Sequence, residues 1–503
     1  MHPLSTEPSS ESSAKAPERC RCRRRRNLLG IFAAGVFVPL LPGCSLFDPP
    51  KIDPAAVVGE LPGRWTAVGG GIPGEAVTGW LDDFGSPRLR DLVEEAVGEN
   101  YDLASARARV AQARERAVIA GADRLPTADL SEQVNRSQNL RGAAFQTVRA
   151  NNFNLSFDMA WEVDLWGRVK DLRDAELDRV ANESNLYEAS RLSLAANVVK
   201  TAFEIIEGRE QIALSRRTLA SLRTNLKILD AKLEAGDAAD RVALEISLSR
   251  ADIARAESAV LGYQRQVDGA KRVLESLLGR FPAGTIESLS RLPRITREVP
   301  AGLPGELLLR RPDLLAAEAT VDAALKEVSA SRKALLPAFR ITGQAGTAST
   351  DDFVDLFNIQ NLVWGIGQNL TRPLYQGGRL RANIRLDEHE RDELVARYAE
   401  TALTAFREVE TALSAEWYLK SQAAALSRAV TESRRAETLS LDEYEQGLVD
   451  IITLLESQRR AFDAESALLT IRLTLMTNRV DLYLALGGDF DHVPGGSDGE
   501  PVR

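Results

Sequence analysis

Residues 153–168 read FNLSFDMAWEVDLWGR, and this stretch joins the two patterns that decide the fold. From Phe153 to Val163 apolar and polar residues alternate with the period of a β-strand. A strand of about ten residues with one apolar and one polar face is typical of a transmembrane β-barrel, and it fits a sheet that covers a soluble core equally well. A long stretch without proline begins after Gly167, which predicts a long helix.

The same order of elements is expected twice in the chain. Each half contains a helix, two strands joined by a loop, a very long helix, a turn and another long helix. The residues of the first half that recur 211 positions later are Leu103, Ala106, Val110, Ala113, Pro126, Arg168, Gly236 and Glu245. The sequence therefore predicts an internal twofold repeat.

The long helices are predicted from the absence of proline. No proline occurs in residues 127–281 or 374–493, and we expect the longest helices at 168–235 and 379–446. At 1.5 Å per residue each reaches about 100 Å. Apolar residues at alternating steps of three and four, as in 219–233, are typical of coiled coils and also of any helices that pack side by side. The fold class is thus mainly α with a small β part.

Four strands per chain predict an oligomer if the sheet lies in lipid. The second half alternates over 362–370 and begins a partner strand at Phe339 and Ile341, whereas the first strand, near 128–135, has a weak apolar face. An open four-stranded sheet in hydrocarbon leaves unpaired backbone groups at its edges, each costing several kcal/mol. A closed barrel therefore requires several copies of the chain, of a number that these residues do not decide.

The N-terminus resembles an export signal. Five arginines within 21–26 precede the uncharged segment 28–41, which is too short to cross a ~30 Å hydrocarbon core as a helix. Leu41-Pro42-Gly43-Cys44 resembles a bacterial lipobox, so residues 1–43 are predicted to be a signal peptide and Cys44 to carry lipid. The alternatives are an uncleaved anchor or an unmodified cysteine, and twin-arginine rather than secretory export. Residues 44–79, rich in Pro and Gly, are expected to form a lipid anchor and extended linker.

Composition excludes several classes of function. The net charge is −9 and no basic stripe follows residue 26, so a nucleic-acid partner is not expected. The three cysteines all lie within the first 44 residues, and only three histidines occur in the whole chain. Thiolate metal sites, cysteine nucleophiles and histidine triads are therefore not expected in the body of the protein, and we predict no enzyme activity, no metal and no cofactor apart from lipid on Cys44.

Several motifs resemble those of a known family. Residues 309–318 read LRRPDLLAAE, 373–379 read PLYQGGR, 444–458 read YEQGLVDIITLLESQ, and 486–488 read LGG. They resemble the outer membrane factor family, the TolC-like and OprM-like exit ducts of Gram-negative efflux and type I secretion systems. The resemblance covers residues 77–488.

The resemblance implies a homotrimer in the outer membrane. Three chains would share a 12-stranded β-barrel, and their long helices would form an α-barrel that projects into the periplasm. The loops near 135–150 and 347–360 would face the exterior. The segments that the resemblance implies are an outer membrane efflux repeat at 80–280, an inter-repeat linker at 281–308, a second repeat at 309–488 and a disordered tail at 489–503.

The resemblance also implies roles for individual residues. The periplasmic aperture would lie at Glu456, Thr453 and Asp450, although Glu456 replaces the aspartate that is usual in the family and could equally be a solvated helix residue. The turns that contact an adaptor would be marked by Gly236, Asp240, Gly447 and Leu448. A hinge or packing role between the repeats, rather than a binding site, is expected for the signature residues Arg310, Arg311, Pro312 and Asp313.

The expected function is that of an exit duct for solutes. Its partners would be copies of itself, a periplasmic adaptor and an inner-membrane pump, expected to be of the resistance-nodulation-division type. The alternatives are the outer-membrane component of a type I protein secretion system, or a periplasmic coiled-coil lipoprotein without a pore. The alternation within 153–163 favours a pore over a coiled-coil scaffold.

Overall fold

The computed structural model describes most of the chain after its N-terminal segment. All described residues belong to the unit Cys44–Arg503, and they are 57, 59, 61–68, 79–141, 146–234, 239–287, 291–293, 298–350 and 352–489. The predicted signal peptide, Cys44, Gly236 and nearly all of the predicted C-terminal tail lie outside these ranges.

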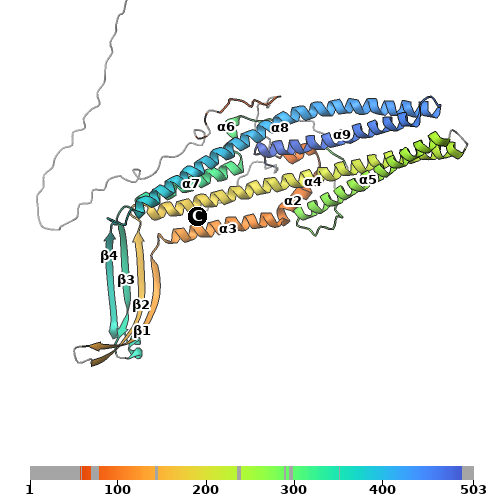
Figure 1. Cartoon of the computed structure of the whole chain (residues 1–503). Coiled ribbons are helices and arrows are strands. Elements are labelled where there is room, and N and C mark those ends of the chain that lie inside the picture. Colours follow the sequence, from red (N-terminus) through yellow and green to blue (C-terminus); the bar gives the residue numbers. More distant parts are fainter. Residues whose placement is uncertain are drawn as a thin grey trace, which may run out of the picture. The chain divides into compact units, whose positions relative to one another are not determined.

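The elements follow the predicted order in both halves (Figure 1). The first half comprises the 3₁₀ helix η2 (Trp80–Phe84), α2 (Pro87–Glu99), α3 (Tyr101–Ala122), β1 (Thr127–Arg141), β2 (Gln146–Val163), α4 (Arg168–Glu234) and α5 (Ala239–Leu277). The second comprises α6 (Pro304–Leu307), α7 (Pro312–Lys333), β3 (Ala338–Ser349), the 3₁₀ helices η3 (Phe353–Phe357) and η4 (Ile359–Asn361), β4 (Leu362–Thr371), α8 (Arg379–Glu445) and α9 (Ile451–Ala485). The predicted mainly helical fold with four strands and an internal repeat is confirmed.

Glycines mark the starts and ends of the long helices. Gly167 precedes α4 with φ 75° and Gly378 precedes α8 with φ 86°, conformations that side chains with a Cβ adopt only with strain. At the end of α8, Gly447 has φ 72°; its N–H donates to the Tyr444 carbonyl, and the next N–H, of Leu448, donates to Glu443. This pair of bonds is a Schellman cap, which satisfies the last free carbonyls of the helix.

The four strands form one antiparallel sheet in the order β1-β2-β3-β4. The β1–β2 ladder continues to the pair Arg141↔Gln146, so most of the predicted loop 135–150 is strand. The second loop begins after Ser349 rather than at 347 and contains η3 and η4. The first difference has a simple cause: backbone groups of asparagine, glutamine and arginine pair in a ladder as well as those of apolar residues, and alternation marks only the part of a strand that has an apolar face.

The long helices associate as two hairpins, α4 with α5 and α8 with α9 (Figure 1). Helix α7 contacts both α4 and α8, so it joins the two halves beside the sheet. Close to the tips of the hairpins a small apolar cluster connects all four long helices; its buried members are Leu229, Val242, Ile246, Tyr444, Ile451 and Leu454. The two hairpins are therefore packed together both beside the sheet and near their tips.

The largest core lies where the start of the first half meets the end of α9. The ring of Trp80 stacks on that of Tyr483 at 5.7 Å between centroids, and Phe84 meets Phe203 of α4 edge-on at 5.2 Å. All four side chains are buried, and the burial of each phenylalanine contributes roughly 1.5–3 kcal/mol of transfer free energy. Of the helices in the described ranges, none has the length and apolar character needed to cross a membrane.

Candidate functional site

The sheet has two faces of opposite character. Because successive side chains alternate, the register assigns every strand residue to one of the two faces. The apolar face carries Leu130, Val134, Phe153, Leu155, Phe157, Met159, Trp161, Val163, Phe339, Ile341, Leu362, Trp364, Ile366 and Leu370. Within this single chain Trp364 is 73% exposed and Ile366 is 80% exposed. Side chains of this kind that nothing in the described chain covers call for an apolar environment such as lipid.

The opposite face is mainly polar. Asp129 of β1 pairs with Asp158 of β2, which pairs with Gln344 of β3, so the three form one row across the strands. The rows farther along this face carry serines and asparagines. Near the helices, the Glu162 carboxylate accepts hydrogen bonds from Arg340 at 3.2 Å and from Arg168, the first residue of α4, at 2.7 Å. This face suits contact with water.

The sheet is not closed by the chain itself. In the described sheet β1 and β4 are its two edges, and they do not pair with each other. β4 is exposed along all ten of its residues. Unpaired edge groups are tolerated in water and are costly in hydrocarbon, so a lipid-facing sheet with these edges needs further strands from other copies.

The predicted aperture residues lie on the first turns of α9. The Asp450 carboxylate caps the helix, because its Oδ1 accepts hydrogen bonds from the Thr453 backbone N–H at 2.9 Å and from the Thr453 hydroxyl at 2.8 Å. The contact between Asp450 and Thr453 therefore stabilises the first turn of α9. Beside them, Leu448 in the turn is 70% exposed.

The Glu456 carboxylate does not stand alone. Its Oε2 accepts hydrogen bonds from Arg459 at 2.7 and 3.0 Å, and its Oε1 accepts one from Arg460 at 2.8 Å. These bonds, of which the one from Arg460 has the largest effect, hold the pKa of Glu456 below its ordinary value. The carboxylate therefore stays ionised over a wider pH range. Sequence reasoning missed both arginines, although their spacing of three and four residues is the one that brings side chains together on a helix.

The other predicted contact residues are partly described. Asp240 lies in the first turn of α5, at the far end of the first hairpin, whereas Gly236 is outside the described residues. Behind the two turns, the Asn225 amide of α4 donates to the Gln458 side chain of α9 at 2.8 Å, and both residues are buried. This contact connects the first hairpin to the helix that carries Glu456.

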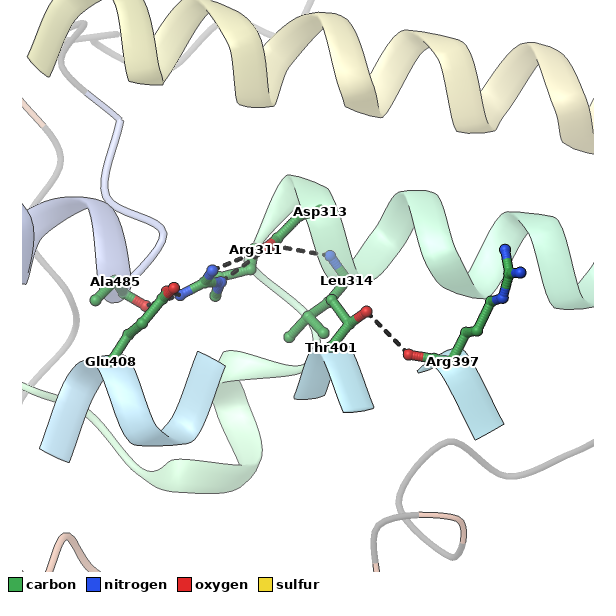
Figure 2. Close-up of polar contacts among 7 residues, drawn as sticks. All are labelled: Arg311, Asp313, Leu314, Arg397, Thr401, Glu408 and Ala485. Carbon is green, nitrogen blue, oxygen red and sulfur yellow. Dashed lines mark hydrogen bonds and ion pairs between the residues drawn. The ribbon is translucent and has the colours of Figure 1, made fainter. Parts of the chain in front are cut away.

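The signature residues lie at the opposite end of α9 from the predicted aperture residues, about 50 Å away along the helix. Figure 2 shows Arg311 bound to three groups: the Asp313 carboxylate at 2.7 and 3.0 Å, the Glu408 carboxylate at 2.7 Å and the Ala485 carbonyl at 3.2 Å. Pro312 occupies the first turn of α7, where its missing N–H costs nothing, and Arg310 is partly exposed. Arg311 thus ties the start of α7 to α8 and to the end of α9.

The first repeat has an equivalent contact with different chemistry. Asn100, 211 residues before Arg311, donates from its side-chain amide to the Leu277 carbonyl near the end of α5 at 2.9 Å. Glycine follows in both places: a Cβ on Gly279 would clash with the Glu99 carbonyl, and one on Gly487 would lie 3.3 Å from the Arg311 Cα. In both repeats, therefore, the end of the last long helix packs closely against the start of the helix that precedes the strands, α5 against α3 and α9 against α7.

Comparison with known proteins agrees with this architecture. The model of the outer membrane efflux protein family matches residues 92–280 and 303–488. The outer membrane protein OprJ of Pseudomonas aeruginosa is 31% identical over 474 residues, covering 93% of this chain and 97% of OprJ. The pyoverdine export outer membrane protein OpmQ of Pseudomonas putida is 32% identical over 422 residues, covering 81% of this chain and 87% of OpmQ.

Among solved structures, the open state of the MtrE outer membrane channel of Neisseria gonorrhoeae superimposes with a TM-score of 0.79. It is 26% identical, and the match covers 88% of this chain and 98% of MtrE. The chain therefore belongs to the outer membrane efflux protein family, as its motifs predicted.

Proposed function

We propose that this chain is the outer-membrane exit duct of a tripartite efflux system, through which solutes pass without any bond being made or broken. The observation that carries the proposal is the open, two-faced sheet at one end of two long helical hairpins. An apolar face toward lipid and a polar face toward water make the wall of a pore, and the helices extend that wall beyond the membrane. The relatives are channels and export proteins of the outer membrane rather than enzymes.

Three copies of the chain would close the wall. The edges β1 and β4 are complementary in direction, because an antiparallel order of four strands leaves its first and last strands antiparallel to each other. Pairing β4 of one copy with β1 of the next therefore continues the ladder. Twelve strands make a barrel wide enough for a water-filled lumen, which four cannot.

The helical end would serve as the regulated entrance and as the contact for an adaptor. The parts of the chain that would meet a periplasmic adaptor are Leu448, exposed beside the Gly447 cap, and the segment from Gly236 to Asp240 in the first half. A pump of the resistance-nodulation-division type is the expected inner-membrane partner. Glu456, on the second turn of α9, would form a ring of three at the narrow entrance.

Cys44 would hold the chain to the inner leaflet of the outer membrane by covalent lipid, since it follows a signal-like segment. Cells fed radiolabelled palmitate should label the wild-type chain, and the substitution Cys44→Ser should abolish the label. Label retained on Cys44→Ser would contradict the anchor.

The function is tested by conductance. Protein purified in detergent should migrate as a trimer that heat converts to monomer, and it should insert into planar bilayers as discrete conducting steps. A protein-free detergent control should give none. A monomer that inserts without current would contradict the duct and would favour a helical scaffold without a pore.

A further inference from the structure

The β1–β2 hairpin extends beyond the rest of the sheet. The β2–β3 ladder ends at the pair Phe153↔Ser349, whereas the β1–β2 ladder continues from Asn135↔Asn152 to Arg141↔Gln146. This extension has two strands only, and a two-stranded hairpin on its own is marginally stable in water. A partner that binds it would add to its stability.

The extension differs in charge from the rest of the chain. Residues 133–157 contain no aspartate or glutamate and include Arg136, Arg141 and Arg149, in a protein whose net charge is −9. Arg136 and Arg149 are exposed. The Arg149 Nε donates to the Gln138 side chain at 3.0 Å, which orients the guanidinium across the hairpin.

The register places Arg136 and Arg149 just past the end of the apolar rows, on the same face of the strands. Arg136 lies on the same face as Val134 one row below, and Arg149 lies on the same face as Phe153 two rows below. Below them the apolar rows run from Phe153 to Val163, about 25 Å along the membrane normal if the strands tilt by ~40°. In the described sheet, Glu132 is the single carboxylate on this face, separated from Arg136 by the Val134 row.

We propose that Arg136 and Arg149 bind phosphate groups of the phosphorylated glycolipid, lipopolysaccharide, that forms the outer leaflet. The proposal rests on the proposed function, which puts the sheet in the outer membrane with the hairpins outward. Guanidinium groups at the boundary of an apolar band lie at the depth of lipid headgroups, and their planar donors match phosphate oxygens. Because the row faces lipid rather than the polar lumen side, the bound phosphates belong to neighbouring lipid and not to a solute in transit.

Binding of lipopolysaccharide to the full-length detergent-purified chain tests the proposal. The probes are purified lipopolysaccharide and the same material after removal of its lipid A phosphates. The wild type should bind the phosphorylated probe at least about tenfold more tightly, and the double variant Arg136→Gln/Arg149→Gln should lose that difference. The matched control is Arg428→Gln/Arg435→Gln, which removes two exposed arginines from α8 and should bind like the wild type.

Three results of the binding experiment would overturn the proposal. They are equal binding by wild type and double variant, a wild-type affinity that does not depend on the phosphates, and equally tight binding to nanodiscs of phosphatidylglycerol. Conductance in bilayers free of lipopolysaccharide provides the folding control, since the double variant should conduct like the wild type. A current changed by the double variant would assign the arginines to the pore instead. Absence of current in the wild type would refute the proposed function alone.

Discussion

At the scale of the residue, Arg311 shows how a charged motif can serve packing. Only 9% of this residue is exposed, and its guanidinium donates to oxygen atoms of the protein itself. A buried guanidinium is stable only when its donors are satisfied, and here they are satisfied by α7, α8 and α9 together. This contact therefore holds the start of α7 to α8 and α9 at the junction of the repeats.

Replacing Arg311 should destabilise the fold strongly. Arg311→Met would leave the Asp313 and Glu408 carboxylates and the Ala485 carbonyl without their shared donor, at a cost of about 3 kcal/mol or more. The measurement is the thermal midpoint of the helical circular dichroism of the purified protein. Arg310→Met, at the partly exposed neighbour, is the control, and an equal loss in both variants would contradict the role assigned to Arg311.

Two glycines with similar backbones should tolerate alanine differently. A Cβ added to Gly447 (φ 72°) would meet no atom of the described residues within 4 Å, so Gly447→Ala should cost only the backbone strain, about 1 kcal/mol. Gly487 (φ 68°) faces Arg310 and Arg311 at 3.3 Å, so Gly487→Ala should cost roughly 2–3 kcal/mol. Chemical denaturation of both variants under one set of conditions gives the comparison, and a reversed order would count against the helix-end contact.

At the scale of the element, the start of α9 combines a helix cap with a paired acid. Asp450 and Thr453 stabilise the first turn, and Glu456 is held by Arg459 and Arg460. The proposed ring at the entrance thus contains cations beside its carboxylates, so removal of the acid and removal of the arginines should have opposite effects.

Single-channel block by a trivalent cation should separate these charges. Glu456→Gln leaves two arginines unpaired and should raise the blocking concentration severalfold, whereas Arg459→Gln/Arg460→Gln frees the carboxylate and should lower it severalfold. The cation is applied from the helical side in planar bilayers. Changes of the same sign in both variants, or no change in either, would remove Glu456 from the entrance.

Helices and strands could be predicted where the sequence repeats a pattern. Contacts between residues far apart in the sequence could not be predicted. The absence of proline and the 211-residue offset predicted α4 and α8 to within one residue of their ends. The extension of β1 and β2 past the apolar rows was not predicted, because its residues carry no alternation. The bond from Arg311 to Glu408 joins residues 97 positions apart, and no local pattern encodes which helix face will approach another.

At the scale of the whole molecule, several half-buried carboxyl groups oppose folding at neutral pH. Burial is the leading cause that raises the pKa of Asp178, Glu210, Glu318, Glu327 and Glu437. Hydrogen bonds lower the pKa of Glu456, in the opposite sense. A carboxyl whose pKa is higher in the folded than in the unfolded chain binds its proton preferentially when folded, so the destabilisation it causes is relieved as pH falls through its folded pKa.

The folded protein should accordingly be more stable at mildly acidic than at neutral pH. We expect the thermal midpoint to rise as pH falls from 7.5 toward 5, the side on which the raised pKa values lie. Glu437→Gln, beside Glu465, should raise the midpoint at pH 7.5 by roughly 2 °C and weaken the pH dependence. Glu115→Gln, an exposed site on α3, is the control, and a midpoint that falls monotonically with acidification would contradict the prediction.

The β2–β3 ladder has a consequence for how such a subunit can evolve. It joins the two halves of one polypeptide by the same antiparallel pairing that would link β4 of one copy to β1 of the next. Six separate half-length subunits could form the same wall, but two different kinds would have to alternate without error. A single polypeptide fixes that alternation, so contacts that differ between the halves, such as the amide of Asn100 and the guanidinium of Arg311, would always occupy alternate positions around the proposed ring.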